Sequence, residues 1–112
     1  MIIAGVDGSR ASCAAVAWAV DDAKRRHEPL RIVHAVNRDS YRFSRFHAAP
    51  EPDVLDRMAR TMVTEAAELA SERQLDVEIS TEVVEGPAAV ALREQAKDAT
   101  EIVIGLAFIK IF

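Results

Sequence analysis

The chain has 112 residues, half of them hydrophobic, with 14 Lys and Arg against 18 Asp and Glu and a formal net charge of -4. This composition suits one domain with a packed core, residues 1–112, and excludes a largely disordered chain. The acidic balance argues against nucleic-acid binding, which needs a basic surface. No apolar run reaches membrane-spanning length, and no basic region precedes the first apolar run, so we expect a cytoplasmic protein without a signal peptide.

The amino-terminal stretch Ile2–Ser9 is an apolar run that ends in an acid, a glycine and a serine. Such a run predicts a buried strand and a tight turn, in which Gly8 permits the turn and Ser9 or Ser12 caps the next helix. Asp7 would then lie at the carboxyl end of the strand, where open α/β sheets bind ligands. Two interpretations stay open: Asp7 hydrogen-bonds a ligand hydroxyl or amine, or it only holds the turn.

A helix is predicted over Ser12–Lys24 and a second strand over Leu30–Val36. The inward face of this helix is expected to carry Cys13, Val16, Ala17 and Val20. As the only cysteine, Cys13 excludes an internal disulfide, and we expect a small packed side chain. A lone strand histidine such as His34 is more often structural than catalytic, and no partner at ligand spacing indicates a metal site.

The stretch Asn37–Asp53 is a polar loop with interspersed aromatic residues, longer than most connections. It leaves the carboxyl end of the second strand, so a lid over a ligand and a plain connection are both open. A second helix is predicted over Val54–Gln74. Its apolar stripe is expected to consist of Leu55, Met58, Met62, Ala66 and Leu69.

The remaining chain predicts an edge strand, a third helix and a fourth strand. The strand Val77–Val84 alternates apolar and polar residues, the helix Ala88–Ala99 has Pro87 at its first position, and Ile102–Gly105 is apolar. Strands alternating with helices predict an α/β fold with an open, mainly parallel, doubly wound sheet and Rossmann-like or flavodoxin-like layers. Right-handed crossovers place the first two helices on one face and the third on the other.

Five motifs, in order and over nearly the whole chain, resemble the universal stress protein family. These motifs are residues 3–9, 17–19, 33–36, 84–88 and 102–106. The resemblance implies a sheet in the order 3-2-1-4-5 and, in many members, ATP bound at the strand ends. It further implies that Asp7 faces the adenosine, that the backbone of Val36 meets adenine, and that Ile104 and Gly105 approach the ribose and phosphates.

The sequence departs from the family pattern after Gly105. The family has there a glycine-rich segment whose N–H groups receive the phosphates, then a fourth helix and a fifth strand. This chain continues with the apolar residues 106–112, and no glycine follows Gly105. We therefore expect a C-terminally incomplete domain with strand order 3-2-1-4, lacking the fourth helix and fifth strand. An adenosine-shaped pocket would remain, with weak or no ATP binding.

An open apolar edge on the fourth strand invites pairing with another chain. We expect Ile102–Phe112 to form an extended strand buried against a second copy, which gives a homodimer. The alternative is that this tail folds back over its own sheet.

Three functions follow, in order of preference. The first is a non-enzymatic stress-response module with a degenerate adenine-nucleotide site that acts as a dimer. The second is an ATP-binding stress protein whose phosphates are held by a partner chain. The third is a small nucleotide hydrolase that uses Asp7 with His34 or His47, although no Walker loop, Gly-x-Gly-x-x-Gly or nucleophile–base pattern supports it. A receiver domain is disfavoured because its acidic cluster is reduced here to Asp7.

Overall fold

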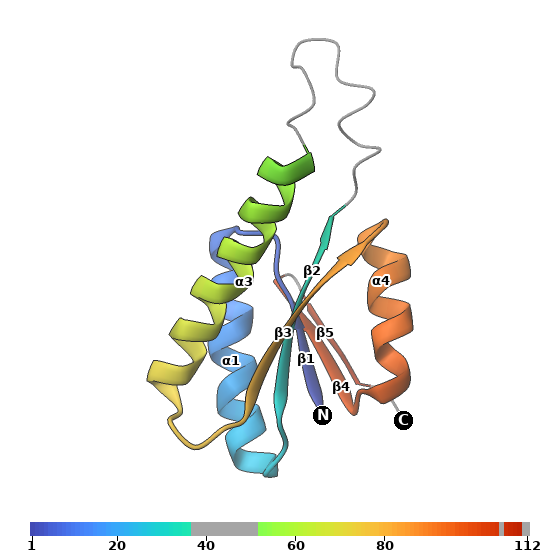
Figure 1. Cartoon of the computed structure of the whole chain (residues 1–112). Coiled ribbons are helices and arrows are strands. Elements are labelled where there is room, and N and C mark those ends of the chain that lie inside the picture. Colours follow the sequence, from blue (N-terminus) through green and yellow to red (C-terminus); the bar gives the residue numbers. More distant parts are fainter. Residues whose placement is uncertain (37–51, 106, 111–112) are drawn as a thin grey trace.

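The computed structural model describes residues 1–36, 52–105 and 107–110 (Figure 1). Its elements are β1 (Ile2–Gly5), α1 (Arg10–Arg26), β2 (Leu30–Val36), α3 (Pro52–Arg73), β3 (Ile79–Glu85), α4 (Ala88–Gln95), a 3-10 turn (Ala96–Asp98), β4 (Glu101–Ile104) and β5 (Ala107–Lys110). The loop Asn37–Asp53, for which the sequence left both a lid and a plain connection open, lies outside the described residues except at its last two positions. Among the described helices, none is long and apolar enough to cross a membrane.

One sheet in the order β3-β2-β1-β4-β5 runs through the molecule. The pairs β1–β2, β1–β4 and β2–β3 are parallel, which confirms the predicted α/β sheet and its 3-2-1-4 order. The central strand β1 is completely buried at Ile2, Ile3 and Ala4. Strand β3 lies at the edge, as its alternation of polar and apolar residues predicted.

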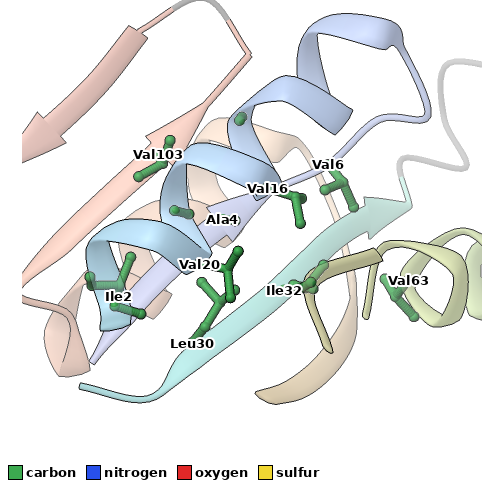
Figure 2. Packing of buried hydrophobic residues seen from close by; sticks show 13 residues of the cluster. Ile2, Ala4, Val6, Val16, Val20, Leu30, Ile32, Val63 and Val103 are labelled. Atoms are coloured by element: carbon green, nitrogen blue, oxygen red, sulfur yellow. The ribbon is translucent and has the colours of Figure 1, made fainter. Parts of the chain in front are cut away.

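Helices α1 and α3 cover one face of the sheet and α4 covers the other, as the crossover rule predicted (Figure 1). The larger core lies under α1 and α3, and Figure 2 shows Val16 and Val20 of α1 packed over Ile2 and Ala4 of β1. The smaller core on the α4 side contains Ile3, with Leu92 packed against it. Successive residues of β1 therefore serve opposite cores because side chains alternate along a strand.

Capping residues give α1 its limits. The hydroxyl oxygen of Ser9 accepts a hydrogen bond from the N–H of Ser12 at 3.1 Å, so Ser9 is the N-cap. At the other end His27 adopts the left-handed conformation, with φ 57°, and its N–H bonds to the carbonyls of Ala23 and Lys24. The helix therefore begins and ends two residues beyond the predicted limits of 12 and 24.

The predicted inward face of α1 was partly wrong. Val16 and Val20 are buried as expected, but Cys13 is exposed. Ala15 and Ala19 are buried against the sheet. Because α1 has alanines on several sides, its sequence does not define a single apolar stripe. The helix lies close to the sheet, so the face with the smallest residues is the one that packs against it.

The predicted stripe of α3 was also partly wrong. Leu55 is buried as expected, whereas Met58 is 53% exposed and Leu69 is 36% exposed. The residues that pack deepest are instead Ala59, Val63 and Ala70. The helix contacts both the sheet and α1, so small side chains occupy the tightest positions and the longer ones of the expected stripe lie toward its rim.

The expectation that the fifth strand is missing was wrong. Residues Ala107–Lys110 form β5, which pairs antiparallel with β4 through partners Ile104↔Ala107 and Glu101↔Lys110. Only residues 105 and 106 separate the two strands, which suffices for a hairpin but not for a crossover helix. Consequently β4 is not an edge, and Ile102–Phe112 is not one extended strand. The alternative that the tail folds back onto its own sheet is closer to the structure.

Two smaller corrections concern α4 and β4. Pro87 is the N-cap of α4 rather than its first helical residue, with ψ 140°. The helix ends at Gln95 and continues only as a 3-10 turn, short of the predicted Ala99. Strand β4 begins one residue earlier than predicted, at Glu101. That residue is completely buried, and neither apolar pattern nor turn chemistry indicated it.

An ion pair clamps α1 to α3 near the end of each helix. The guanidinium of Arg73 donates to both carboxylate oxygens of Asp21, at 2.9 and 2.8 Å, and the amide of Gln74 donates to the same carboxylate at 3.0 Å. These hydrogen bonds, led by the one from Arg73, lower the pKa of Asp21 below its ordinary value. The pair is largely exposed, so solvent screens its contribution to stability.

The inward face of α3 can be tested with two substitutions. We expect Leu55→Ala to lower the free energy of unfolding by about 2–5 kcal/mol because it opens a cavity in the core. Met58→Ala should change it by less than about 0.5 kcal/mol because that side chain is mostly in solvent. Urea unfolding measures both. If Met58→Ala were as costly as Leu55→Ala, the helix face predicted from sequence would be restored.

The clamp also predicts how stability depends on acid. A lowered pKa in the folded state stabilises the protein above the ordinary aspartate pKa, and this contribution is lost as the pH falls through the folded value. We therefore expect Asp21→Asn to weaken the loss of stability below about pH 4, the region in which the unfolded carboxyl is protonated. Thermal unfolding against pH measures this difference. If the variant and the parent chain lost thermal stability equally as the pH falls, the clamp would have no role in acid sensitivity.

Candidate functional site

A cavity of about 350 Å³ opens at the carboxyl ends of β1 and β4, between the start of α1 and α4. It is lined by Gly5, Val6, Asp7, Ser9, Ala11, Ser12, Val33, Ala35, Ala88, Leu92, Ile104 and Gly105. The size is within the range of small-molecule sites, and most of the lining is apolar with a few polar groups. Its place at the switch in strand order, between β1 and β4, is where doubly wound sheets bind ligands.

Asp7 supplies the acidic group of this cavity. Its carboxylate accepts a hydrogen bond from the N–H of Ser9 at 2.9 Å, which stabilises the turn that Gly8 makes with φ 86°. Hydrogen bonds from the side chain and then the backbone of Ser9, with a smaller one from Ser12, lower the pKa of Asp7. The carboxylate is therefore charged at neutral pH. It holds the turn and lines the cavity at once, so the geometry is compatible with both interpretations.

The start of α1 supplies the other polar groups. Ser9 caps the helix, and the hydroxyl of Ser12 donates to the carbonyl of Ser9 at 2.9 Å. Because these hydroxyls are already engaged, their part in the cavity is to fix its wall. The 17-residue helix also directs the positive end of its dipole toward this region.

Gly105 lets β4 end close against α1. A Cβ atom placed on Gly105 would lie 2.9 Å from the Cβ of Ala11 and 3.0 Å from its carbonyl carbon. Only glycine fits there without a shift of the helix. Across the cavity, a Cβ on Gly5 would lie 3.2 Å from Ile104 and 3.3 Å from Leu92. Small residues thus keep the cavity open while the walls remain in contact.

The structure brings three of the four predicted site residues, Asp7, Ile104 and Gly105, to one cavity. Val36 does not line it. Its carbonyl accepts a hydrogen bond from the N–H of Gly86 at 2.9 Å, and its side chain is buried. The neighbouring Ala35 lines the cavity, because side chains alternate along β2.

Sequence reasoning missed the contributions of Val33, Ala35, Ala88 and Leu92. The first two lie in the predicted second strand, and the other two begin the predicted third helix. Alternation along the strand could have indicated Val33 and Ala35 together. The sequence pattern gave little indication for Ala88 and Leu92. Their place in the cavity depends on how the first turns of α4 lie over the carboxyl end of β1, and that is a tertiary contact.

The histidines do not form a catalytic pair with Asp7 in the described structure. The Nδ1 atom of His34 lies 2.7 Å from the backbone carbonyl of Val6, which gives this half-buried ring a structural partner. His47 lies outside the described residues. Within residues 1–36, 52–105 and 107–110, no group of three His, Cys, Asp or Glu side chains is placed to hold a metal ion.

Comparison with known proteins agrees with this fold. The model of the universal stress protein family matches residues 1–106. Universal stress protein MT2699 of Mycobacterium tuberculosis (strain CDC 1551 / Oshkosh) is 35% identical over 107 residues, which cover 93% of this chain and 36% of the relative. Universal stress protein Rv3134c of M. tuberculosis (strain ATCC 25618 / H37Rv) is 32% identical over 104 residues, with 93% and 37% covered. The chain thus spans about a third of the length of these relatives.

Solved structures show the same architecture. A universal stress protein family member from Burkholderia pseudomallei superposes with a TM-score of 0.74 at 24% identity, over 93% of this chain and 79% of that one. A universal stress protein crystallised in complex with cAMP superposes with a TM-score of 0.63 at 25% identity, over 87% and 62%. These structures share the fold, and the family model over residues 1–106 shows that the chain belongs to the universal stress protein family.

Proposed function

We propose that this chain is a stress-response module that binds an adenine nucleotide in the cavity between β1 and β4. The observation that carries the proposal is the cavity itself, with a charged Asp7, the start of α1 and an apolar wall in one place. A flat purine suits the wall formed by Val33, Leu92 and Ile104, and a ribose hydroxyl suits the acceptor oxygens of Asp7. The cAMP complex of a family member supports the same class of ligand.

We further propose that the site holds a ligand with one phosphate more firmly than ATP. After β4 the chain turns directly into β5, so the described backbone at Gly105 forms a hairpin connection. A glycine-rich phosphate cradle would need several successive N–H groups aimed at the ligand. A triphosphate would therefore leave charged oxygens without donors, each such hydrogen bond being worth about 1.5–3 kcal/mol.

A second candidate is an ATP-binding module whose phosphates are completed by another chain. Saturable micromolar binding of ATP with magnesium, tighter than binding of AMP or cAMP, would favour this candidate. In either case we propose ligand binding rather than turnover, because the polar groups that line the cavity are engaged in a turn and a helix cap. Steady ATP hydrolysis that is lost in Asp7→Ala would favour the hydrolase instead.

The role of Asp7 can be separated from its turn. We expect Asp7→Asn to keep the acceptor for the Ser9 N–H while replacing the other carboxylate oxygen with an amide donor. If Asp7 accepts from the ribose, affinity for AMP or cAMP should fall by about 10- to 100-fold with little change in thermal stability. Isothermal titration calorimetry of both nucleotides measures the affinity.

Asp98→Asn is the matched control, because this exposed residue precedes β4 at the opposite end of the sheet. It should bind both nucleotides like the parent chain. Unchanged affinity in Asp7→Asn would show that Asp7 only holds the turn. No binding of AMP, cAMP or ATP to the parent chain would contradict the proposed function.

We also propose that the module forms a homodimer through its C-terminal strand. In the described part of the chain β5 ends the sheet, so its outer edge presents backbone groups that another strand can pair with. The proposed contact lies within the segment Ile102–Phe112, at the edge of β5 rather than of β4.

Sedimentation equilibrium tests the homodimer. We expect the parent chain to dimerise at micromolar concentration and Ile109→Lys to raise the dissociation constant by about tenfold or more, because a charge on an edge strand opposes pairing. Val90→Lys, on a half-exposed residue of α4, is the control and should dimerise normally. A monomeric parent chain, or equal association of the two variants, would contradict this contact.

A further inference from the structure

A methionine side chain packs against the turn that carries Asp7. A Cβ atom placed on Gly8 would lie 3.2 Å from Cε and 3.7 Å from Sδ of Met62, so the thioether of this α3 residue is in contact with the turn. Met62 also packs against the larger core under α1 and α3. Because a methionine side chain is long and unbranched, it fills the irregular space between a helix and a turn.

The turn has little freedom to move away from this contact. Gly8 has φ 86°, a conformation that residues other than glycine rarely adopt, and the carboxylate of Asp7 accepts from the N–H of Ser9 at 2.9 Å. On the preceding side, Nδ1 of His34 lies 2.7 Å from the carbonyl of Val6. A shift of Gly8 would therefore also move Asp7, which lines the cavity between β1 and β4, and Ser9, which caps α1.

The sulfur of Met62 lies where a small oxidant can reach it. Met62 is partly exposed, and it lines two cavities beside the turn, of about 250 and 460 Å³. The exposed residue Glu65 lines both cavities as well, so both open to solvent. Hydrogen peroxide is little larger than water, whose share of liquid volume is about 30 Å³, and it fits into either cavity.

A hydroperoxide converts a thioether to a sulfoxide in one balanced step. The sulfur lone pair attacks one peroxide oxygen, so an S–O bond forms while the O–O bond breaks. The sulfur loses two electrons and the peroxide gains them. With hydrogen peroxide, the proton on the transferred oxygen moves to the leaving oxygen, which departs as water. The sulfoxide is polar, and methionine sulfoxide reductases return it to the thioether.

We propose that Met62 is a site of reversible oxidation by hydroperoxides, and that its sulfoxide displaces the turn after β1 and weakens nucleotide binding. The added oxygen is polar and enlarges the side chain at a place where the thioether already touches Gly8 and the larger core. The side chain must then withdraw or push the turn, and either movement removes the packing that holds Gly8. The effect on nucleotide binding rests on the proposed function, whereas the modification and the movement of the turn do not.

Met58 provides the comparison within the same helix. It lies one turn before Met62 on α3, is 53% exposed and lines the larger of the two cavities. Among the described residues outside the turn, the atoms within 4 Å of a Cβ on Gly8 all belong to Met62. Met58 should therefore be oxidised at least as fast as Met62, without moving the turn.

Peroxide treatment of three 112-residue chains tests the proposal: the parent, Met62→Leu and Met58→Leu. All three also carry Cys13→Ser, because the exposed thiol of Cys13 would be oxidised as well. Leucine keeps an apolar side chain of similar volume but has no sulfur to oxidise. Peptide mass mapping locates each added oxygen, and nuclear magnetic resonance follows the amide signals of Gly8 and Ser9.

We expect an added oxygen on Met62 in the parent, with shifted Gly8 and Ser9 signals in the parent and in Met58→Leu. In Met62→Leu these signals should stay in place although Met58 is oxidised. Reduction by methionine sulfoxide reductases should restore the original spectrum. Unmodified Met62 beside oxidised Met58, or equal shifts in Met62→Leu, would overturn the proposal.

Calorimetric titration with AMP tests the link to the cavity. Oxidation should weaken AMP binding by about tenfold in the parent and in Met58→Leu, near the lower end of what loss of the Asp7 hydrogen bond costs, and leave Met62→Leu unchanged. If AMP binds equally before and after oxidation of Met62, the link is refuted. If no chain binds AMP before oxidation, the proposed function is wrong, and the signals of the turn decide on their own whether Met62 acts on it.

Discussion

The close approach of α1 to β1 and β4 is the constraint on which the rest of this structure depends. Ala15 and Ala19 are buried, and Gly105, which follows β4, lies so near α1 that a Cβ atom on it would be 2.9 Å from the Cβ of Ala11. A larger residue at these positions would hold the helix away from the sheet. The turn after β1, the helix cap at Ser9 and the walls of the cavity all take their positions from this contact.

The same contact produces opposite chemistry at the two ends of α1. Its start, beside Asp7, is open and polar and leaves room for a ligand of moderate size. Its last turns carry Asp22, and both Asp22 and Glu101 of β4 are buried. Open α/β sheets bind ligands at the carboxyl ends of their strands. The residues at the amino-terminal ends of the strands can therefore be closely packed without blocking a ligand site. Strand β4 connects the two regions: Glu101 at its start is buried, and Gly105, directly after its end, lines the cavity.

The hairpin of β4 and β5 changes how the C-terminal segment is understood. The apolar residues after Gly105 do not match the glycine-rich segment and helix of the family pattern. Antiparallel pairing gives Ala107–Lys110 backbone partners on β4 without a crossover helix. The departure from the family pattern leaves the order of the four parallel strands unaffected.

The sequence by itself determined the order of strands and helices, the central position of β1, the faces taken by the helices, and the placement of Asp7, Ile104 and Gly105 at the same end of the sheet. These properties follow from local patterns, namely apolar runs, capping serines and glycines at turns, together with the handedness of crossovers. Only the tertiary structure decided the inward faces of α1 and α3, the exposure of Cys13, the hairpin to β5 and the burial of Glu101 beside Asp22. Each of these depends on which segments distant in sequence come into contact, and a helix whose alanines lie on several sides can face the sheet in more than one way until that contact forms.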